Sequence, residues 1–230
     1  MALAPAADRT PTPPTSADRT PTPPTAADRT ATGTERLILL SRHGQTEWNV
    51  TGRRQGRRDS PLTAQGLRDA ARVAELAQAY PVDAIVASPL GRAQRTAAIV
   101  SAALHLPVTP LADLAEIDHG TFTGHTNDEL DLLSPGWQAA READLYRWRF
   151  PGGESYRDAY LRAGRALASA VVTSRRCPLL VAHGMLGRML MAVLEPVDPE
   201  EALNRYLPHG TVLAFPVPPG RVVAAEPAAA

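Results

Sequence analysis

The sequence predicts an α/β fold with a mostly parallel central sheet, and two observations support this prediction. Short aliphatic runs of strand length alternate along the chain with longer stretches of helical periodicity. Such alternation is typical of parallel strands joined by crossover helices. The chain of 230 residues is also long enough for one substantial domain of this class with a well-buried core.

Residues 1–34 differ in composition from the remainder of the chain. The segment Ala-Asp-Arg-Thr-Pro-Thr-Pro-Pro-Thr at 7–15 recurs at 17–25, and its opening recurs at 27–30. A ten-residue repeat this rich in Pro and Thr has little to bury, so we expect a disordered tail with polyproline II character. A role as an interaction or phosphorylation arm stays open. The globular domain is expected at residues 35–225.

The first half of this domain is expected to begin with a buried strand at residues 37–40, which stops abruptly at polar residues. Thr63 is suited to cap a helix that runs to about Tyr80, where Pro81 ends it. That helix carries its apolar residues along one face: Leu67, Ala70, Val73, Ala74 and Ala77. A second strand is expected at 84–87, and the helix after it has the same periodicity: Ala93, Ala97, Val100 and Leu104.

The second half opens with an irregular stretch at 111–125. Two helical segments between 127 and 148 are expected to break at Ser134-Pro135-Gly136, and Ser155 is suited to cap a long helix to about Ser174. The remaining expected elements are a strand at 179–182, a helix at 186–194, a short helix opening at Asp198-Pro199, and strands at 211–215 and 222–223.

Composition excludes several classes of function. The 24 basic and 24 acidic residues balance, which argues against nucleic acid as the main partner. No apolar run reaches the length of a membrane span, and the first residues lack the basic start and apolar core of a signal peptide. Cys177 is the single cysteine, so no intramolecular disulfide can form. We therefore expect a soluble cytoplasmic protein, and we expect Cys177 itself to be buried and inert.

Two histidines follow strands in the same way. His43 and His183 each come directly after an aliphatic run, and each is followed by glycine. Ligands of open α/β sheets bind outside the carboxyl ends of the strands, so both imidazoles would face one crevice if the two strands are neighbours. Arg42 lies beside the first histidine and Arg92 follows another strand end. Paired guanidinium groups match phosphate best, so we expect an anionic, phosphorylated ligand.

Five sequence elements together resemble the histidine phosphatase superfamily, in its phosphoglycerate mutase-like branch. They are, in order, Arg42-His43-Gly44-x-Thr46-x-x-Asn49, Ser88-Pro89-x-x-Arg92-Ala93-x-x-Thr96-Ala97, Glu116, Pro151-Gly152-Gly153-Glu154-Ser155 and His183-Gly184. The similarity spans roughly residues 35–215. It implies a three-layer sandwich with helices on both faces of the sheet and a small helical cap insertion at about 117–153.

The resemblance also implies a role for each residue. His43 would attack phosphorus to form a phosphohistidine, which requires a neutral imidazole nitrogen. Arg42, Arg92 and His183 would surround the phosphoryl oxygens, and Glu116 would act as general acid and base. Further phosphate or substrate contacts are expected from a second group: Thr46, Asn49, Gln55, Gly56, Gly184 and Met185. A loop role fits Gln55 and Gly56 equally well.

No cofactor and no metal are expected. The histidines include no His-x-His or His-Glu-x-x-His spacing, and no Gly-x-Ser-x-Gly elbow supports a serine hydrolase. The expected partner is a small phosphomonoester substrate, with no nucleic acid and no membrane, and a homodimer is one expected assembly state.

Three functions are compatible with this pattern: a phosphomonoesterase (a phosphoric monoester hydrolase), a phosphoglycerate mutase, and a catalytically inactive phosphate-binding protein of the same fold. The inactive protein is disfavoured because each assigned catalytic position holds the expected residue type. Glu116 and His183 are 67 positions apart, which is short for mutases with a basic, lid-forming insertion here. We therefore favour the phosphatase. Phe122-Thr123-Gly124-His125 and His209 depart from the family pattern, which leaves substrate contacts unassigned.

The cap is expected to set specificity. Arg141, Arg147 and Arg149 could meet a carboxylate or second phosphate, and Trp137, Tyr146 and Trp148 could wall a pocket, although a solvated helix pair with buried aromatics fits equally well. Glu154 fits either a helix start or a substrate contact. Arg95 is expected at the surface, and His119 and His125 are expected to be polar loop residues, with contact to the substrate as the less favoured alternative.

Overall fold

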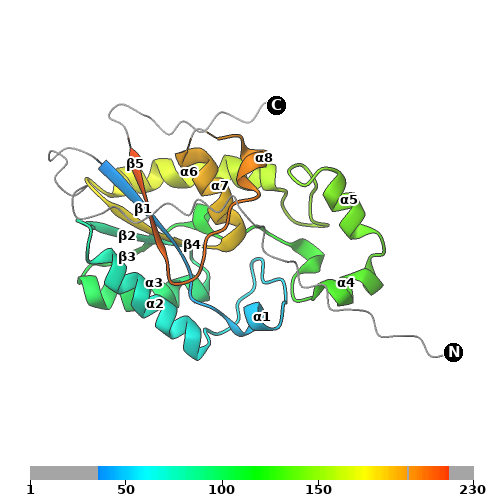
Figure 1. Cartoon of the computed structure of the whole chain (residues 1–230), viewed down its shortest axis with the longest axis horizontal. Helices are drawn as coiled ribbons and strands as arrows, with labels where there is room; N and C mark the ends of the chain where they lie inside the picture. The colour runs from blue at the N-terminus through cyan, green and yellow to red at the C-terminus, as the bar shows by residue number, and fades with distance from the viewer. Residues whose placement is uncertain (1–35, 196, 218–230) are drawn as a thin grey trace, which may run out of the picture. The chain divides into compact units, whose positions relative to one another are not determined.

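A five-stranded sheet forms the centre of the protein (Figure 1), in a computed structural model that describes residues 36–195 and 197–217. Its strands are β1 (Arg36–Arg42), β2 (Ala84–Ala87), β3 (Val108–Pro110), β4 (Pro178–Ala182) and β5 (Val212–Val217). The spatial order is β3-β2-β4-β1-β5, in which β5 alone pairs antiparallel. The expected mostly parallel sheet is therefore confirmed.

Eight α-helices occur in the described part of the chain. They are α1 (Glu47–Val50), α2 (Ala64–Ala77), α3 (Gly91–Leu104), α4 (Asn127–Leu133), α5 (Trp137–Ala143), α6 (Tyr156–Thr173), α7 (Gly184–Leu194) and α8 (Pro199–Ala202). Two short 3₁₀ helices, Ala112–Leu114 and Gly120–Phe122, lie in the stretch expected to be irregular.

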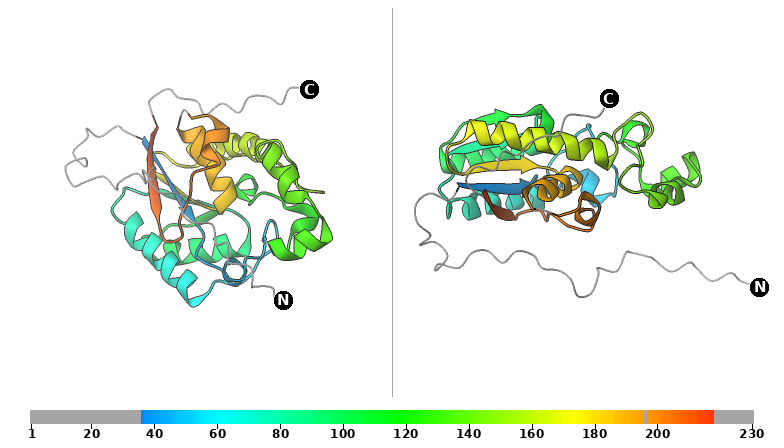
Figure 2. Two further views of the ribbon diagram at one scale, coloured as in Figure 1. Left: turned by 45° about the vertical axis from the view of Figure 1, so that its right-hand side comes forward. Right: turned by 90° about the horizontal axis from the view of Figure 1, so that it is seen from above.

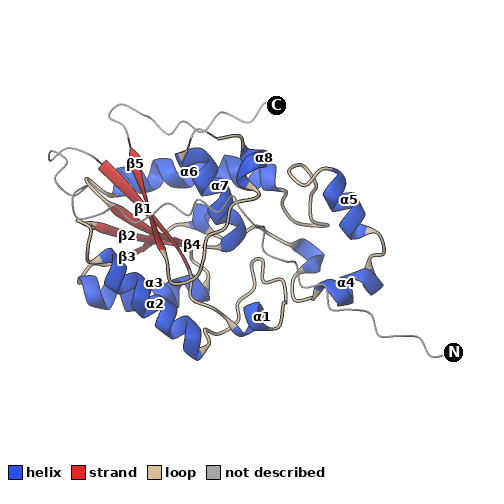
Figure 3. Cartoon of the chain, viewed as in Figure 1, coloured by secondary structure: helices blue, strands red, loops and turns tan. Residues whose placement is uncertain are grey.

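The sheet lies between two helical layers, as the three-layer expectation requires (Figure 3). Successive side chains of a strand point to opposite faces. Accordingly, Leu39 of β1 packs with residues of α2 and α3, while Ile38 and Leu40 pack with residues of α6 and α7. All three side chains are fully buried, which explains why the strand reads as a continuous aliphatic run.

The helices α4 and α5 lie beyond the end of the sheet, as both views in Figure 2 show. They occupy the region expected to form the cap, and they are separated at 134–136 as expected. Each has only seven residues. Helices this short are not stable alone and depend on side-chain packing. The proposed cap boundaries at about 117–153 remain a prediction.

The face of α2 differs from the expected one. Leu67 was expected to be buried but is 42% exposed, whereas Asp69 is buried. The carboxylate of Asp69 accepts hydrogen bonds from the backbone N–H of Gln45 (3.0 Å) and from Gln65 (2.8 Å). The helix therefore turns a polar side chain inward because the loop after β1 offers it a donor.

Other boundaries agree closely with expectation. Thr63 caps α2, and Ser155 with Asp158 forms a capping box at α6. The edge strand β3 was not expected, since it has three residues and includes Pro110, which only an edge strand tolerates. The tail at 1–34 and the strand expected at 222–223 lie outside the described residues. Within the described ranges, no helix combines the length and apolar character needed to cross a bilayer.

Candidate active site

The two strands that end in histidine are neighbours. β1 pairs parallel with β4, with Arg42 opposite Ala182, and the backbone N–H of His43 donates to the carbonyl of Ala182 at 3.0 Å. The imidazole rings of His43 and His183 consequently lie 5.1 Å apart between centroids. Gly44 is required next, because a Cβ there would lie 2.1 Å from the carbonyl oxygen of Gly66.

His43 is held as a neutral imidazole with one nitrogen available. Its Nδ1 lies 2.8 Å from the carbonyl oxygen of Gly44, which can only accept, so Nδ1 carries the proton. Nε2 is therefore unprotonated, and it accepts from Nε of Arg92 at 3.2 Å. Burial, followed by the charges of Arg92 and Arg42, holds the pKa of His43 well below its usual value. This is the protonation state that a nitrogen nucleophile needs.

Arg92 is fixed in place by several acceptors. Its Nη1 donates to the carbonyl of Arg58 at 2.7 Å and to Asp59 Oδ1 at 2.8 Å, and its Nη2 donates to the carbonyl of Gly56 at 2.9 Å. Asp59 also accepts from the backbone N–H of Gly91 at 2.7 Å. Burial lowers the pKa of Arg92, while Glu116 and Asp59 raise it. The guanidinium is thus rigid before any ligand binds.

Arg42 lies against the start of α7. Gly184 leaves room for it, since a Cβ at Gly184 would be 3.0 Å from Cζ of Arg42. Nε of Arg42 is buried and has no hydrogen-bond partner. Burial lowers its pKa, and Tyr206 and Glu116 partly counter that effect. A buried guanidinium with an unused donor is suited to receive an anion.

Glu116 reaches the same place from a loop. Its carboxylate accepts three backbone N–H groups, from Ile117 (2.9 Å), Leu186 (2.9 Å) and Met185 (3.1 Å). Arg162 of α6 holds the loop itself by donating to the carbonyls at 113, 115 and 116. The site therefore combines residues from β1, β4, α3, α7 and this loop.

Glu154 supports that loop and does not reach the ligand space. It forms an ion pair with Arg162 at 2.8 Å and another with Arg57 at 3.3 Å, and it accepts from the backbone N–H of Asp118 at 2.9 Å. These contacts favour a structural role for Glu154 over the substrate contact that the sequence left open.

A cavity of about 280 Å³ opens beside these groups. It is lined by Arg42, His43, Asn49, Arg53, Arg54, Gln55, Gly56, Arg92, Glu116, His119, Gly184, Met185, Arg188 and Tyr206. Five of these side chains are arginines and one is a carboxylate. The cavity therefore favours a small ligand with more than one negative charge.

Comparison with known proteins agrees with this geometry. The model of the histidine phosphatase superfamily, branch 1, matches residues 38–225. The chain belongs to that superfamily.

Proteins similar to this chain have several names. A Salmonella choleraesuis protein, "Probable phosphoglycerate mutase GpmB", is 38% identical over 159 residues, which cover 68% of this chain and 74% of that protein. A mycobacterial glucosyl-3-phosphoglycerate phosphatase in complex with VO3 is 31% identical with a TM-score of 0.71, over 78% of this chain and 92% of that chain. The alpha-ribazole phosphatase from Shigella flexneri is 26% identical with a TM-score of 0.70, over 77% of this chain and 89% of that chain. The fold and the family are thus shared with both phosphatases and mutase-like proteins.

Two expected site residues, His183 and Thr46, are not at the cavity surface. His183 is fully buried next to His43, and its Nε2 is 2.7 Å from Oγ of Ser88. Its Nδ1 has no hydrogen-bond partner, and burial followed by the charge of Arg92 lowers its pKa well below the usual value. Thr46 is fully buried as the N-cap of α1, where it forms a capping box with Asn49. Its contribution to a ligand site is therefore the placement of Asn49.

Met185 lines the cavity, but its backbone N–H, which was expected to contact phosphate or substrate, donates to Glu116. His125 and His209 do not line the cavity. His209 instead places Nδ1 2.6 Å from the carbonyl oxygen of His43. Cys177 is buried, and its burial raises the pKa of the thiol to about 12, in line with an inert residue.

His119 lies in a loop, as expected, but it is also buried and lines the cavity. The side chain is 4% exposed, its ring packs 4.5 Å from that of Phe150, and its Nε2 lies 3.0 Å from Sδ of Met185. Burial lowers its pKa to about 4. Its place three residues after Glu116 was the available signal, because a loop that delivers one side chain to a site often delivers another.

Sequence reasoning also missed Arg53, Arg54, Arg188 and Tyr206, which line the cavity. The signal for the first two was their position directly before Gln55. Two of the cap arginines considered earlier are occupied at the surface: Arg147 pairs with Glu200 and Arg149 with Asp158.

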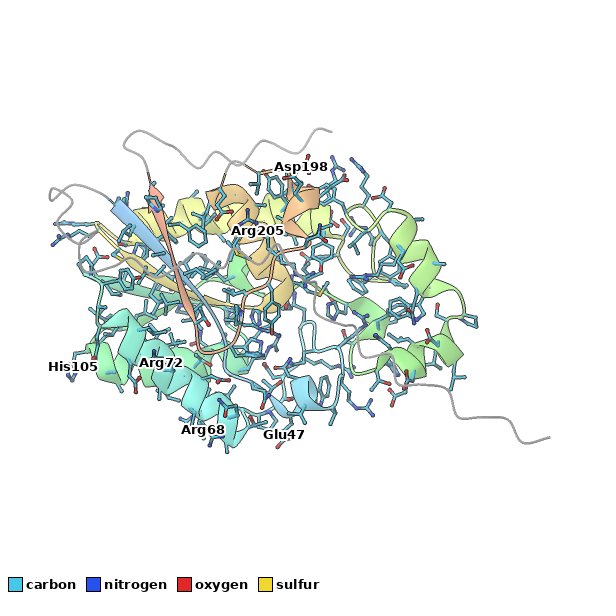
Figure 4. The ribbon with its side chains drawn as sticks, in the orientation of Figure 1. Glu47, Arg68, Arg72, His105, Asp198 and Arg205 are labelled. Atoms are coloured by element: carbon cyan, nitrogen blue, oxygen red, sulfur yellow. The ribbon has the colours of Figure 1, made fainter. Side chains whose placement is uncertain are left out.

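Most arginines elsewhere face solvent. Figure 4 shows Arg68 and Arg72 on the outer side of α2, away from the helices α4 and α5. His105 ends α3 in a left-handed backbone conformation at the same outer side. Among the residues that the structure describes, no group of three or more His, Cys, Asp or Glu side chains could hold a metal ion.

Proposed function

We propose that this protein is a phosphomonoesterase that hydrolyses a small phosphorylated metabolite through a phosphohistidine on His43. The observation that carries the proposal is the state of His43 itself. Its Nδ1–H donates a hydrogen bond to the carbonyl of Gly44, so Nε2 is unprotonated and carries a lone pair. This nitrogen lies beside Arg92, in a cavity lined with arginines. A neutral nucleophile surrounded by cations is the arrangement that phosphoryl transfer needs.

In the first step Nε2 of His43 attacks phosphorus, and the bond between phosphorus and the ester oxygen breaks. Arg42 and Arg92 stabilise the charge on the phosphoryl oxygens. Arg92 does so without reorganisation, because backbone carbonyls and Asp59 already fix it. Glu116 gives its proton to the departing oxygen, so the alcohol leaves neutral.

In the second step Glu116, now a carboxylate, takes a proton from water while the water oxygen attacks the phosphohistidine. The bond between Nε2 and phosphorus breaks, and phosphate leaves with His43 neutral again. The place of Glu116 supports this double role: its carboxylate lines the cavity and is held by the N–H groups of Met185 and Leu186. No metal or cofactor enters either step.

Phosphoglycerate mutase activity is the second candidate, and the 38% identity to a protein named as a probable phosphoglycerate mutase favours it. A mutase must keep water from the phosphoenzyme while the bound substrate reorients in the site. The short helices α4 and α5 are the main structure between Glu116 and α6. So small a cap favours hydrolysis, as does the likeness to two solved phosphatases.

A phosphate-release assay on the purified protein tests the proposal. The panel contains p-nitrophenyl phosphate, sugar phosphates, nucleotides and phosphoglycerates, each with and without EDTA. We expect phosphate release that EDTA does not change, and wild type quenched during turnover should carry acid-labile, base-stable phosphate. His43→Ala should lower kcat by on the order of 10⁴-fold or more and abolish the phosphoenzyme.

The control is His105→Asn, which replaces an exposed histidine in the left-handed conformation with a residue that tolerates it. It should match wild type. Full hydrolysis by His43→Ala would refute the mechanism. Rapid interconversion of 2- and 3-phosphoglycerate with little phosphate release would replace the phosphatase by the mutase.

A further inference from the structure

Arg54 is a cationic side chain built into the wall of the cavity. It lies in the loop between α1 and α2, and its guanidinium stands over the ring of Trp137 at 4.9 Å and that of Phe150 at 5.8 Å. Its Nη2 donates to Asn127 Oδ1 at 2.9 Å. The residues at the start of α4 and α5 thus hold Arg54 in one orientation, against aromatic faces that favour a cation.

This guanidinium lacks a counter-charge. Among the described residues no carboxylate forms an ion pair with Arg54, and its buried Nε has no hydrogen-bond partner. Burial and repulsion by Arg141 lower its pKa to about 10. Its neighbours along the cavity differ, since Arg53 pairs with Glu129 at 2.8 Å and Arg92 with Asp59 at 2.8 Å. A partly buried cation that no carboxylate neutralises is costly, so a ligand that supplies an anion is favoured.

Arg54 is separate from the groups that hold the phosphoryl end. Arg92 contacts His43 directly through its Nε, whereas Arg54 contacts Asn127 of α4 and the rings of Trp137 and Phe150. The cavity therefore has cations at two places, one around His43 and one at the cap. Its volume of about 280 Å³ limits the ligand that spans both to a few carbon atoms beyond the phosphoryl group.

We propose that Arg54 binds a second anionic group of the substrate, so that the preferred substrates are short phosphomonoesters that also carry a carboxylate or a second phosphate. This inference rests on the proposed phosphatase function and narrows its substrate class. A charge-assisted hydrogen bond from the Arg54 guanidinium, which lines the cavity with aromatic faces behind it, supplies the discrimination. Arg147 and Arg149, which the sequence offered for this task, are paired at the surface.

Matched substrates test the proposal. 3-Phosphoglycerate and glycerol 3-phosphate differ in that a carboxylate replaces a hydroxymethyl group. Propane-1,3-diol bisphosphate and its monophosphate make the same comparison for a second phosphate. In at least one pair, wild type should prefer the substrate that carries the second anionic group, by about 10- to 100-fold in kcat/KM. Whichever pair shows the larger preference identifies the anion.

Arg54→Met keeps the length and apolar packing of the side chain and removes the charge. We expect it to erase the preference through a higher KM for the substrate with two anionic groups, while its kcat/KM for glycerol 3-phosphate and p-nitrophenyl phosphate stays near that of wild type. Arg147→Met is the control, because Arg147 is a cap arginine that pairs with Glu200 at the surface and does not line the cavity. It should keep the preference.

Equal loss on all substrates in Arg54→Met, or a wild type without preference in either pair, would overturn the proposal. Hydrolysis of p-nitrophenyl phosphate separates the two conclusions: if it persists without a preference, the phosphatase stands and the Arg54 site fails. If no ester is hydrolysed, calorimetric titration of His43→Ala with 3-phosphoglycerate and glycerol 3-phosphate still decides. Tighter binding of the former that vanishes in His43→Ala/Arg54→Met supports the site, and equal binding refutes it.

Discussion

The two ends of the cavity are built in different ways. The inner end, formed by Arg42, His43 and Arg92, stands on strand ends and on the start of α3, and backbone carbonyls fix its groups. The outer end, formed by Arg54 and the aromatic rings beneath it, stands on a loop and on the two seven-residue helices. The inner end is thus supported by the sheet, while the outer end depends on a loop and two short helices.

This difference has a physical origin. Parallel strands with buried aliphatic side chains bring their carboxyl ends to one edge of the sheet, and this placement does not depend on the conformation of the loops. The outer end relies instead on ring contacts, such as the 5.4 Å between the ring centroids of Phe122 and Trp137 and the 4.9 Å between those of Trp148 and Phe150. The position of the outer end therefore depends on contacts between loop and helix side chains rather than on strand pairing.

Glu116→Gln gives the largest expected effect among further tests of the inner end. Gln keeps the shape but can neither donate an acidic proton nor accept one, so kcat for an alkyl phosphate should fall by about 10²- to 10⁴-fold. For p-nitrophenyl phosphate the first step should change much less, because p-nitrophenolate leaves without protonation. Single-turnover measurements of phosphoenzyme formation from both esters check this. Equal losses with the two leaving groups would contradict the general-acid role.

Arg92→Met should weaken the inner end by a smaller amount and also shift its pH dependence. The lost guanidinium lowers kcat/KM by about 10²- to 10³-fold. Arg92 is the first charge that depresses the pKa of His43, so its removal raises that pKa. Since the neutral imidazole is the nucleophile, activity is lost as pH falls through this pKa, and the acid limb of kcat/KM should move to higher pH.

Arg95→Met is the matched control, because Arg95 lies on the same helix with its side chain exposed. Its pH profile should overlay that of wild type. An acid limb at the same pH in Arg92→Met would mean that a different group sets the limb, and the assignment of His43 as the titrating nucleophile would fail.

The sequence was informative about the inner end and poor about the outer end for the same reason. A strand followed by Arg42-His43-Gly44 is local, so its place can be predicted from the pattern alone. The environment of Arg54 needs Asn127, Trp137 and Phe150, which are distant in sequence, and no local pattern shows that a charged side chain is buried without a partner. His119 lies in a loop as expected, but its burial could not be predicted from that position, because polar loop residues are usually exposed.

Stability against pH gives the smallest of these effects, and it probes His119, which lies between the two ends. Its pKa is about 4 in the folded protein, because of burial, and an unfolded histidine has a pKa near 6.5. Between these values the unfolded chain binds the proton more tightly. The free energy of unfolding therefore falls as pH drops from 6.5 towards 4, and the share of His119 is about 2 kcal/mol between pH 7 and pH 5.

Urea unfolding of wild type and His119→Gln at both pH values measures this share. His43 and His183 also have lowered pKa values and act in the same direction, so wild type should lose more than the His119 share alone. The variant should reduce the loss by about 2 kcal/mol at pH 5. His125→Gln, which changes a histidine half-exposed near the cap, should leave the loss unchanged. An identical loss in His119→Gln would mean that burial does not lower the pKa of His119, and its assignment as a buried, neutral ring would fail.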